Sequence, residues 1–196
     1  MKNKRLHIFD FDDTLVSSGA KVKVIHSSGD IELLQSHEFA TYIEQPGDRF
    51  DFSEFDVYPP DGKVITNTFK LLKKAIQEDG IQNVMVLSAR GKAAPMKAFL
   101  NDNGITDDIH IIGVGSSNPQ AKVTRVLRHM IKAPAPGYTD VYIYEDSIDN
   151  ITAIDSALKA KYPDVKVSAN KIEIKHEMLL RKTIRGIIHE NVIKDD

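Results

Sequence analysis

The sequence lacks cysteine, which excludes disulfide bonds, thiolate metal sites and a cysteine nucleophile. Its absence agrees with a reducing compartment. No apolar run approaches the roughly 18 residues of a membrane span, and residues 1–5 lead into a segment with two aspartates rather than into the core of a signal peptide. The net charge is only −2 and the pI is near 6.4, so the composition shows no global attraction to nucleic acid or to an anionic membrane. These absences favour a cytoplasmic chain with no membrane partner.

An apolar segment near the amino terminus, LHIFDFDDTL from Leu6 to Leu15, carries two carboxylates and a hydroxyl at its end. Side chains two apart in a strand share a face, so Asp10 and Asp12 can converge at the strand's carboxyl end, where open α/β sheets bind ligands. Carboxylates this close repel unless a proton or cation intervenes, and Mg²⁺ prefers such oxygen ligands. The pattern indicates phosphoryl chemistry. The alternative is an acidic turn before a helix, with Thr14 as a cap.

The remaining chain alternates between predicted strands and helices, and its 196 residues with 41% hydrophobic content are enough for one core. Alternation of this kind is typical of an α/β fold with a parallel sheet covered on both faces. We therefore expect a three-layer, Rossmann-like and monomeric molecule. After the first strand, the expected elements are a helix at 64–79, a strand at 83–87, a helix ending near Gly104, a strand at 109–114, a helix from Pro119, a strand at 140–144, a helix at 148–160 and a strand at 165–167.

Residues 16–60 interrupt this rhythm, because they are too many for a connection between a strand and a helix. We expect a small cap insertion, with a hairpin of strands at 21–25 and 31–34 and a short helix at 36–44. Its three phenylalanines, between Phe50 and Phe55, are expected to fill its own core. The core domain then comprises residues 1–15 and 61–196. Because the insertion leaves from the strand that carries Asp10, it should overhang the same site.

Three further positions at strand ends or helix starts carry chemistry. Ser88 ends the second strand at a junction suited to a phosphate oxygen, although serines there often only cap a helix. Lys122 lies in the first turn of a helix, away from its apolar stripe, where most lysines are solvated. Glu145 and Asp146 end the fourth strand, and an isolated acidic pair is usually a turn or a cap.

This order of a double carboxylate, a hydroxyl, a lysine and an acidic pair resembles the haloacid dehalogenase (HAD) superfamily of phosphohydrolases over residues 5 to about 160. The first motif is highly specific. Two positions depart from the family pattern: Asp13 stands where glycine is frequent, and Asn150 where an acidic residue is frequent. The insertion, with its segment FDFSEF, looks like that of uncharacterised members encoded by bacteriophages, and it lies where this superfamily places one kind of cap.

The resemblance implies a Mg²⁺-dependent phosphatase that hydrolyses a phosphate monoester through an aspartyl-phosphate intermediate. Asp10 would be the nucleophile and Asp12 the acid and base, while Ser88 and Lys122 would hold the transferring oxygens. The implied metal ligands are the Asp10 carboxylate, the Asp12 backbone carbonyl and the Asp146 carboxylate. The expected substrate contacts are Thr14, Ala89 and Arg90.

Two other classes of function stay open: a phosphotransferase that uses the same intermediate but excludes water, and a catalytically inactive phosphate-binding module. The sequence does not choose among phosphorylated small molecules, nucleotides and phosphorylated nucleic-acid ends as the substrate. An amphipathic helix is expected at 175–192, where it would cover the domain rather than contact nucleic acid.

Overall fold

The computed structural model describes residues 4–39, 41–106, 108–132 and 137–173. The helix expected at 175–192 lies outside this part of the chain. Within it, no helix is both long enough and apolar enough to cross a membrane.

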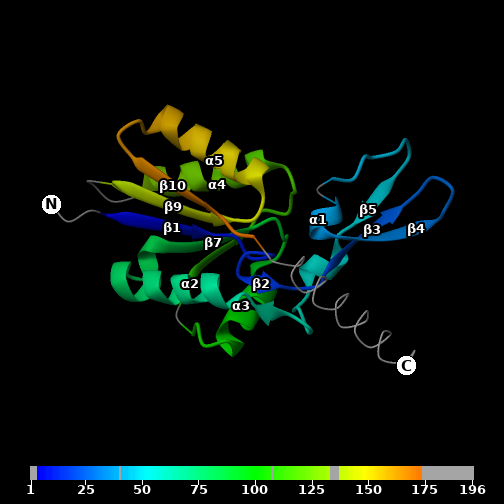
Figure 1. Ribbon diagram of the computed structural model, residues 1–196, viewed down its shortest axis with the longest axis horizontal. Coiled ribbons are helices and arrows are strands. Elements are labelled where there is room, and N and C mark those ends of the chain that lie inside the picture. Colours follow the sequence, from blue (N-terminus) through cyan, green and yellow to red (C-terminus); the bar gives the residue numbers. More distant parts are fainter. Residues whose placement is uncertain (1–3, 40, 107, 133–136, 174–196) are drawn as a thin grey trace, which may run out of the picture.

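A five-stranded parallel sheet forms the centre of the molecule (Figure 1). Its strand order is β10-β9-β1-β7-β8, so the first strand lies in the middle with β9 on one side and β7 on the other. The predicted α/β class with a parallel sheet is therefore confirmed. The strands are β1 (Arg5–Phe9), β7 (Val84–Ser88), β8 (His110–Gly113), β9 (Asp140–Glu145) and β10 (Lys166–Lys171).

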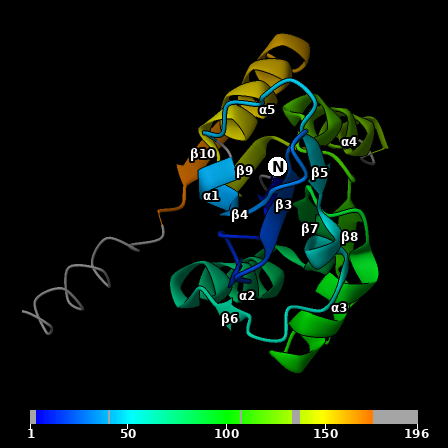
Figure 2. The ribbon, with the colours of Figure 1, turned by 90° about the vertical axis from the view of Figure 1, so that its right-hand side faces the viewer.

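Two helices cover each face of the sheet, α2 and α3 on one side and α4 and α5 on the other (Figure 2). Successive side chains of β1 point to opposite faces of the sheet, which explains this arrangement. Leu6 and Ile8 pack into the apolar cluster under α4 and α5, and Phe9 packs into the cluster under α2 and α3. Each fully buried apolar side chain of this kind contributes roughly 1.5–3 kcal/mol. The helices are α2 (Thr66–Asp79), α3 (Ala93–Asp102), α4 (Pro119–Lys132) and α5 (Ile148–Lys161).

Between β1 and α2 the chain forms a second, antiparallel sheet of order β4-β3-β5 beyond the carboxyl edge of the parallel sheet (Figure 1). The expected hairpin is present as the paired strands β3 and β4. A short ribbon of β2 with β6 lies at its base. These elements are β2 (Val16–Ser17), β3 (Lys21–Ile25), β4 (Ile31–Gln35), α1 (Ser36–Phe39), β5 (Arg49–Asp51), the 3-10 helix η1 (Ser53–Asp56) and β6 (Lys63–Val64).

The helix expected at 36–44 is shorter than predicted, since α1 ends at Phe39. Hydrogen bonds to the Asp48 carboxylate from the Tyr42 hydroxyl and the Gln45 amide hold residues 42–48 in a loop instead. Side-chain acceptors of this kind compete with helical hydrogen bonds for backbone donors.

The phenylalanines of the insertion divide between two environments. Phe50 and Phe52 pack edge-on against Phe39 or tilted against each other, as expected for a small core. Phe55 instead lies under the guanidinium of Arg90, with the guanidinium carbon 5.5 Å from the ring centroid. The expectation of an insertion core therefore does not account for Phe55, which contacts the main sheet domain.

Candidate active site

Parallel pairing brings the predicted motifs to one edge of the sheet. Asp10 follows β1, and its backbone N–H donates to the carbonyl of Tyr144 in β9 at 2.9 Å. Ser88 ends β7 on one side of β1, and Glu145 ends β9 on the other. All three side chains are buried. The strand ends that the sequence predicted as one site thus lie side by side.

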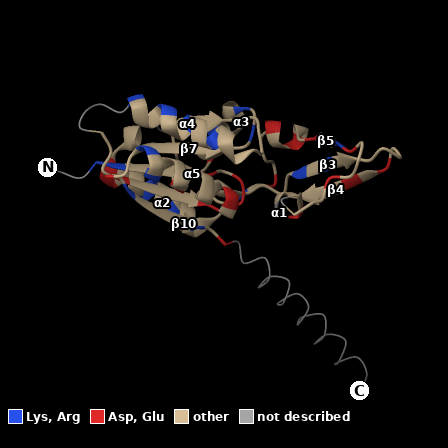
Figure 3. Cartoon of the chain, turned by 90° about the horizontal axis from the view of Figure 1, so that it is seen from above, with Lys and Arg blue, Asp and Glu red and all other residues tan. Residues whose placement is uncertain are grey.

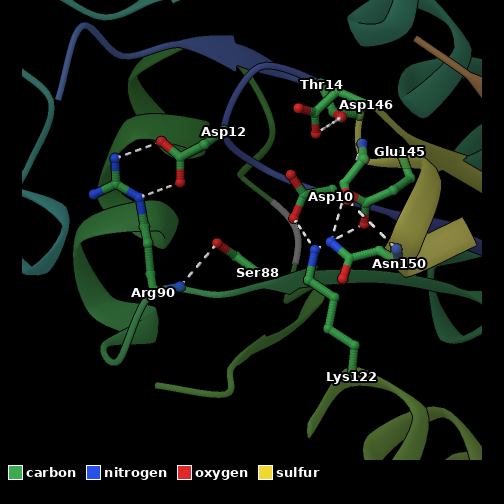
Figure 4. A network of polar contacts seen from close by, with 10 residues as sticks. Asp10, Asp12, Thr14, Ser88, Arg90, Lys122, Glu145, Asp146 and Asn150 are labelled. Carbon is green, nitrogen blue, oxygen red and sulfur yellow. Dashed lines mark hydrogen bonds and ion pairs between the residues drawn. The ribbon is translucent and has the colours of Figure 1, made fainter. Parts of the chain in front are cut away.

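Lys122 is buried rather than solvated, with only 3% of its surface exposed. Its ammonium donates to Asp10 Oδ1 at 2.6 Å and to Glu145 Oε2 at 2.7 Å (Figure 4). Burial alone would lower the pKa of Lys122, but the charges and hydrogen bonds of Asp10 and Glu145 raise it above its ordinary value. The lysine is therefore a fixed cation between two carboxylates.

Asp10, Glu145 and Asp146 form a carboxylate cluster in which one oxygen from each residue lies within 4.8 Å of the others. Burial, and then the charge of Glu145, raise the pKa of Asp10 well above that of an ordinary aspartate. Burial also raises the pKa of Asp146 to about 6, with help from the charge of Asp10. Even with Lys122, three ionised carboxylates leave two negative charges. A hard divalent cation fits this donor set and this charge.

Asp12 is not a member of the carboxylate cluster. Its two oxygens accept a bidentate pair of hydrogen bonds from Arg90, Nε to Oδ2 and Nη2 to Oδ1, both at 2.7 Å (Figure 4). The Ser18 hydroxyl donates to Oδ1 at 2.8 Å. The expected metal contact of Asp12 was through its backbone carbonyl, and that contact stays a prediction.

Arg90 lines the cavity described below, so its predicted contact with the substrate stays a prediction, but its guanidinium also has partners within the protein. Besides Asp12, its guanidinium donates from Nη1 to the carbonyls of Phe55 at 2.6 Å and Val57 at 3.1 Å, and its side chain is fully buried. The guanidinium therefore donates to groups within the protein, and its hydrogen bonds connect Asp12 to the insertion. Sequence reasoning did not find this role. An arginine two residues after a serine at a strand end does not indicate that it pairs with Asp12, 78 residues away.

The other predicted site residues lie around these ion pairs. Thr14 is fully buried, and its hydroxyl makes a long contact of 3.5 Å with Asp146, which lines the cavity. The predicted contact of Thr14 with the substrate stays a prediction. Ser88 and Ala89 line the cavity described below. The Ser88 hydroxyl also accepts the Arg90 backbone N–H at 3.2 Å.

Glu145 and Asn150 gain roles that the sequence left undefined. The Asn150 amide donates to Glu145 Oε1 at 3.1 Å, while Lys122 holds the other oxygen of the same carboxylate. Asn150, at a position where the family pattern often has an acid, therefore orients Glu145 without adding charge. The only available signal was the adjacency of Glu145 to Asp146 at the end of a buried strand.

Two backbone positions shape the loops of the site. Asp13 has φ +55°, in the left-handed region where glycine is favoured and where aspartate is among the better tolerated alternatives. At Gly113 a Cβ atom would lie 2.5 Å from the carbonyl oxygen of Arg90. Glycine there allows the end of β8 to approach the loop that follows Ser88.

A cavity of about 890 Å³ lies between the sheet edge and the insertion. The sheet domain contributes Asp10, Lys122 and Asp146 to its lining, and the insertion contributes Phe39 and Phe52 among others. The insertion thus overhangs the carboxylates, as its point of departure from β1 suggested.

Comparison of the chain with protein-family models, curated proteins and solved structures gives no significant match. The functional assignment therefore depends on the residues and geometry of this site.

Proposed function

We propose that the chain is a Mg²⁺-dependent phosphatase that hydrolyses a phosphate monoester through an aspartyl-phosphate formed on Asp10. One observation carries the proposal: Lys122 is buried against Asp10, beside Asp146, in the lining of a cavity large enough for a small molecule. A fixed cation beside a carboxylate suits the transfer of an anionic phosphoryl group, which depends mainly on positioning and charge. The resemblance of the motifs to the haloacid dehalogenase superfamily supports the same function.

In this mechanism Asp10 is the nucleophile. A carboxylate oxygen of Asp10 forms a bond to phosphorus while the bond from phosphorus to the leaving oxygen breaks, so hydrolysis proceeds in two displacements. Lys122 and Ser88 hold the oxygens of the transferring group. Asp10, Asp146 and the Asp12 backbone carbonyl would hold Mg²⁺, whose positive charge would offset the repulsion between the nucleophile and the anionic phosphate.

Asp12 acts first as an acid and then as a base. It protonates the leaving oxygen, and afterwards it takes a proton from the water that attacks the aspartyl-phosphate, which releases phosphate and restores Asp10. In the structure both oxygens of Asp12 accept hydrogen bonds from Arg90. To act as an acid, Asp12 must therefore exchange at least one of these bonds, so that the freed oxygen takes up a proton and contacts the leaving oxygen.

The test compares Asp10→Asn with the wild-type chain and with Asp149→Asn, which changes an exposed carboxylate in the lining of the same cavity. With an aryl phosphate and Mg²⁺, we expect the wild type and Asp149→Asn to release inorganic phosphate and Asp10→Asn to lose at least about a thousandfold, roughly 4 kcal/mol of barrier. Acid quenching and intact-mass analysis should detect a phosphorylated wild-type chain. A folded Asp10→Asn variant with substantial turnover would overturn the assignment.

Two alternatives give different results in the same assay. A phosphotransferase would consume the ester only when an acceptor alcohol is added. An inactive binding module would release no phosphate under any of these conditions.

A further inference from the structure

Three rings of the insertion, Phe39, Phe52 and Phe55, line the cavity and are called the aromatic wall below. Phe39 and Phe52 pack edge to face, with centroids 5.4 Å apart and planes at 83°. Phe52 nevertheless keeps 41% of its surface exposed. The insertion's own packing therefore leaves part of the Phe52 ring uncovered in a residue that lines the cavity.

The cavity has two chemically different ends. Lys122, Ser88 and all but one of the acidic residues in the described lining come from the sheet domain. The aromatic wall comes from the insertion, which also contributes Asp56. A volume of about 890 Å³ falls within the usual range for small-molecule sites and exceeds what a phosphate group alone would fill. A ligand whose phosphate lies at the sheet edge therefore extends its remaining part toward the rings.

The charge of the lining limits what that remaining part can carry. Among the described residues that line the cavity, seven are acidic and two are basic. Both basic residues are already in ion pairs, Arg90 with Asp12 and Lys122 with Asp10 and Glu145. Acidic residues also lie at the end of the core that faces the insertion (Figure 3). A second phosphate on the ligand would meet this negative lining, and so would the phosphodiester charges of an oligonucleotide.

We propose that the aromatic wall binds a planar ring in the leaving group, so that the substrate is a ring-bearing phosphate monoester without further negative charge. The inference rests on the proposed phosphatase function and adds a substrate class to it. Rings stack on exposed aromatic side chains irrespective of their hydrogen-bonding edges. The ring is either a nucleobase, in a nucleoside monophosphate, or a simple aryl group, and both are included in the test.

The experiment measures kcat/KM for a nucleoside 5′-monophosphate, naphthyl phosphate and glycerol phosphate in the wild type and in Phe52→Ala. We expect Phe52→Ala to lower kcat/KM for at least one ring ester by about tenfold more than for glycerol phosphate, equivalent to about 1.4 kcal/mol. Loss confined to the nucleotide identifies a nucleobase, and loss confined to naphthyl phosphate identifies an aryl group. Phe52→Tyr, which keeps the ring, should restore the preference.

Ile31→Ala is the matched control, because Ile31 is an exposed apolar residue of the same insertion that does not line the cavity. It should leave all three values unchanged. The wild type should also prefer the nucleoside monophosphate to the corresponding 3′,5′-bisphosphate by at least about tenfold. An equal or higher value for the bisphosphate would overturn the charge argument.

Failure of this inference differs from failure of the proposed function. If the wild type hydrolyses esters but Phe52→Ala changes ring esters and glycerol phosphate equally, the aromatic wall does not select a ring. If the wild type hydrolyses no ester, the phosphatase proposal fails, and calorimetric titration of Asp10→Asn with the nucleoside monophosphate, with and without Phe52→Ala, still measures ring binding. The same titration is made with naphthyl phosphate, and equal affinities with and without Phe52→Ala for both ligands would overturn the inference.

Discussion

The ion pair between Arg90 and Asp12 gives a prediction about stability that does not depend on any activity. Arg90→Gln would leave the Asp12 carboxylate, which is only 14% exposed, with the Ser18 hydroxyl as its side-chain donor in the described part of the chain. It would also remove the Nη1 donor from two backbone carbonyls. Removing one partner of a buried ion pair costs about 3–5 kcal/mol. Since a domain unfolds with about 5–15 kcal/mol, such a loss is easily measured.

A double-mutant cycle separates the pair from its surroundings. Urea unfolding of Asp12→Asn, Arg90→Gln and the double variant should give a coupling energy of about 2–3 kcal/mol. The pair Lys97–Asp108 provides the control, since it has the same 2.7 Å separation but side chains that are 49% and 93% exposed. Its coupling energy should be close to zero, because water and salt screen an exposed pair. If the two cycles give the same coupling energy, burial does not strengthen the Arg90–Asp12 pair and the reasoning is wrong.

Two further predictions concern the metal and the insertion. Mg²⁺ at a hundred times its Kd should stabilise the wild type by about 2.7 kcal/mol in thermal unfolding. Asp146→Ala should lose most of this stabilisation, whereas Asp149→Ala should keep it. Equal stabilisation of the wild type and Asp146→Ala would exclude Asp146 as a ligand. In the insertion, the hydrogen bond to Asp48 raises the pKa of His26 above 6.5, so the stability from this pair is fully present below that pH and is lost as the pH rises through the higher folded value. An NMR titration should place the midpoint of His26 above 6.5 and lower it in Asp48→Asn; a midpoint at or below 6.5 in the wild type would contradict the pairing.

The sheet was predictable because its signals are local. Apolar runs that end in polar or charged residues indicated β1, β7 and β9. The helical periodicity of the segments between them indicated that strands and helices alternate. The end of α1 was not predictable in the same way. The loop that follows α1 has a partner outside the predicted helix, because the Tyr42 hydroxyl and the Gln45 backbone N–H both donate to Asp48.

The sequence predicted which sheet edge holds the site, but it did not predict which side chains contact one another there. Parallel strands bring their carboxyl ends to one edge, so the approach of Asp10 and Ser88 follows from topology. The contact of Lys122 with Asp10 spans 112 residues, and a helix lysine away from the apolar stripe is usually solvated. Burial reverses that expectation, because the sheet edge supplies two carboxylates that only a cation can balance.

Arg90 joins the chemistry of the sheet edge to the position of the insertion. The same guanidinium donates to the proposed acid and base, Asp12, and to the backbone carbonyls of Phe55 and Val57. If residues 55–57 move away, Nη1 loses its acceptors inside a fully buried environment, and an unmet donor there costs about 1–3 kcal/mol. The orientation of Asp12 and the position of residues 55–57 therefore both depend on hydrogen bonds from one buried side chain.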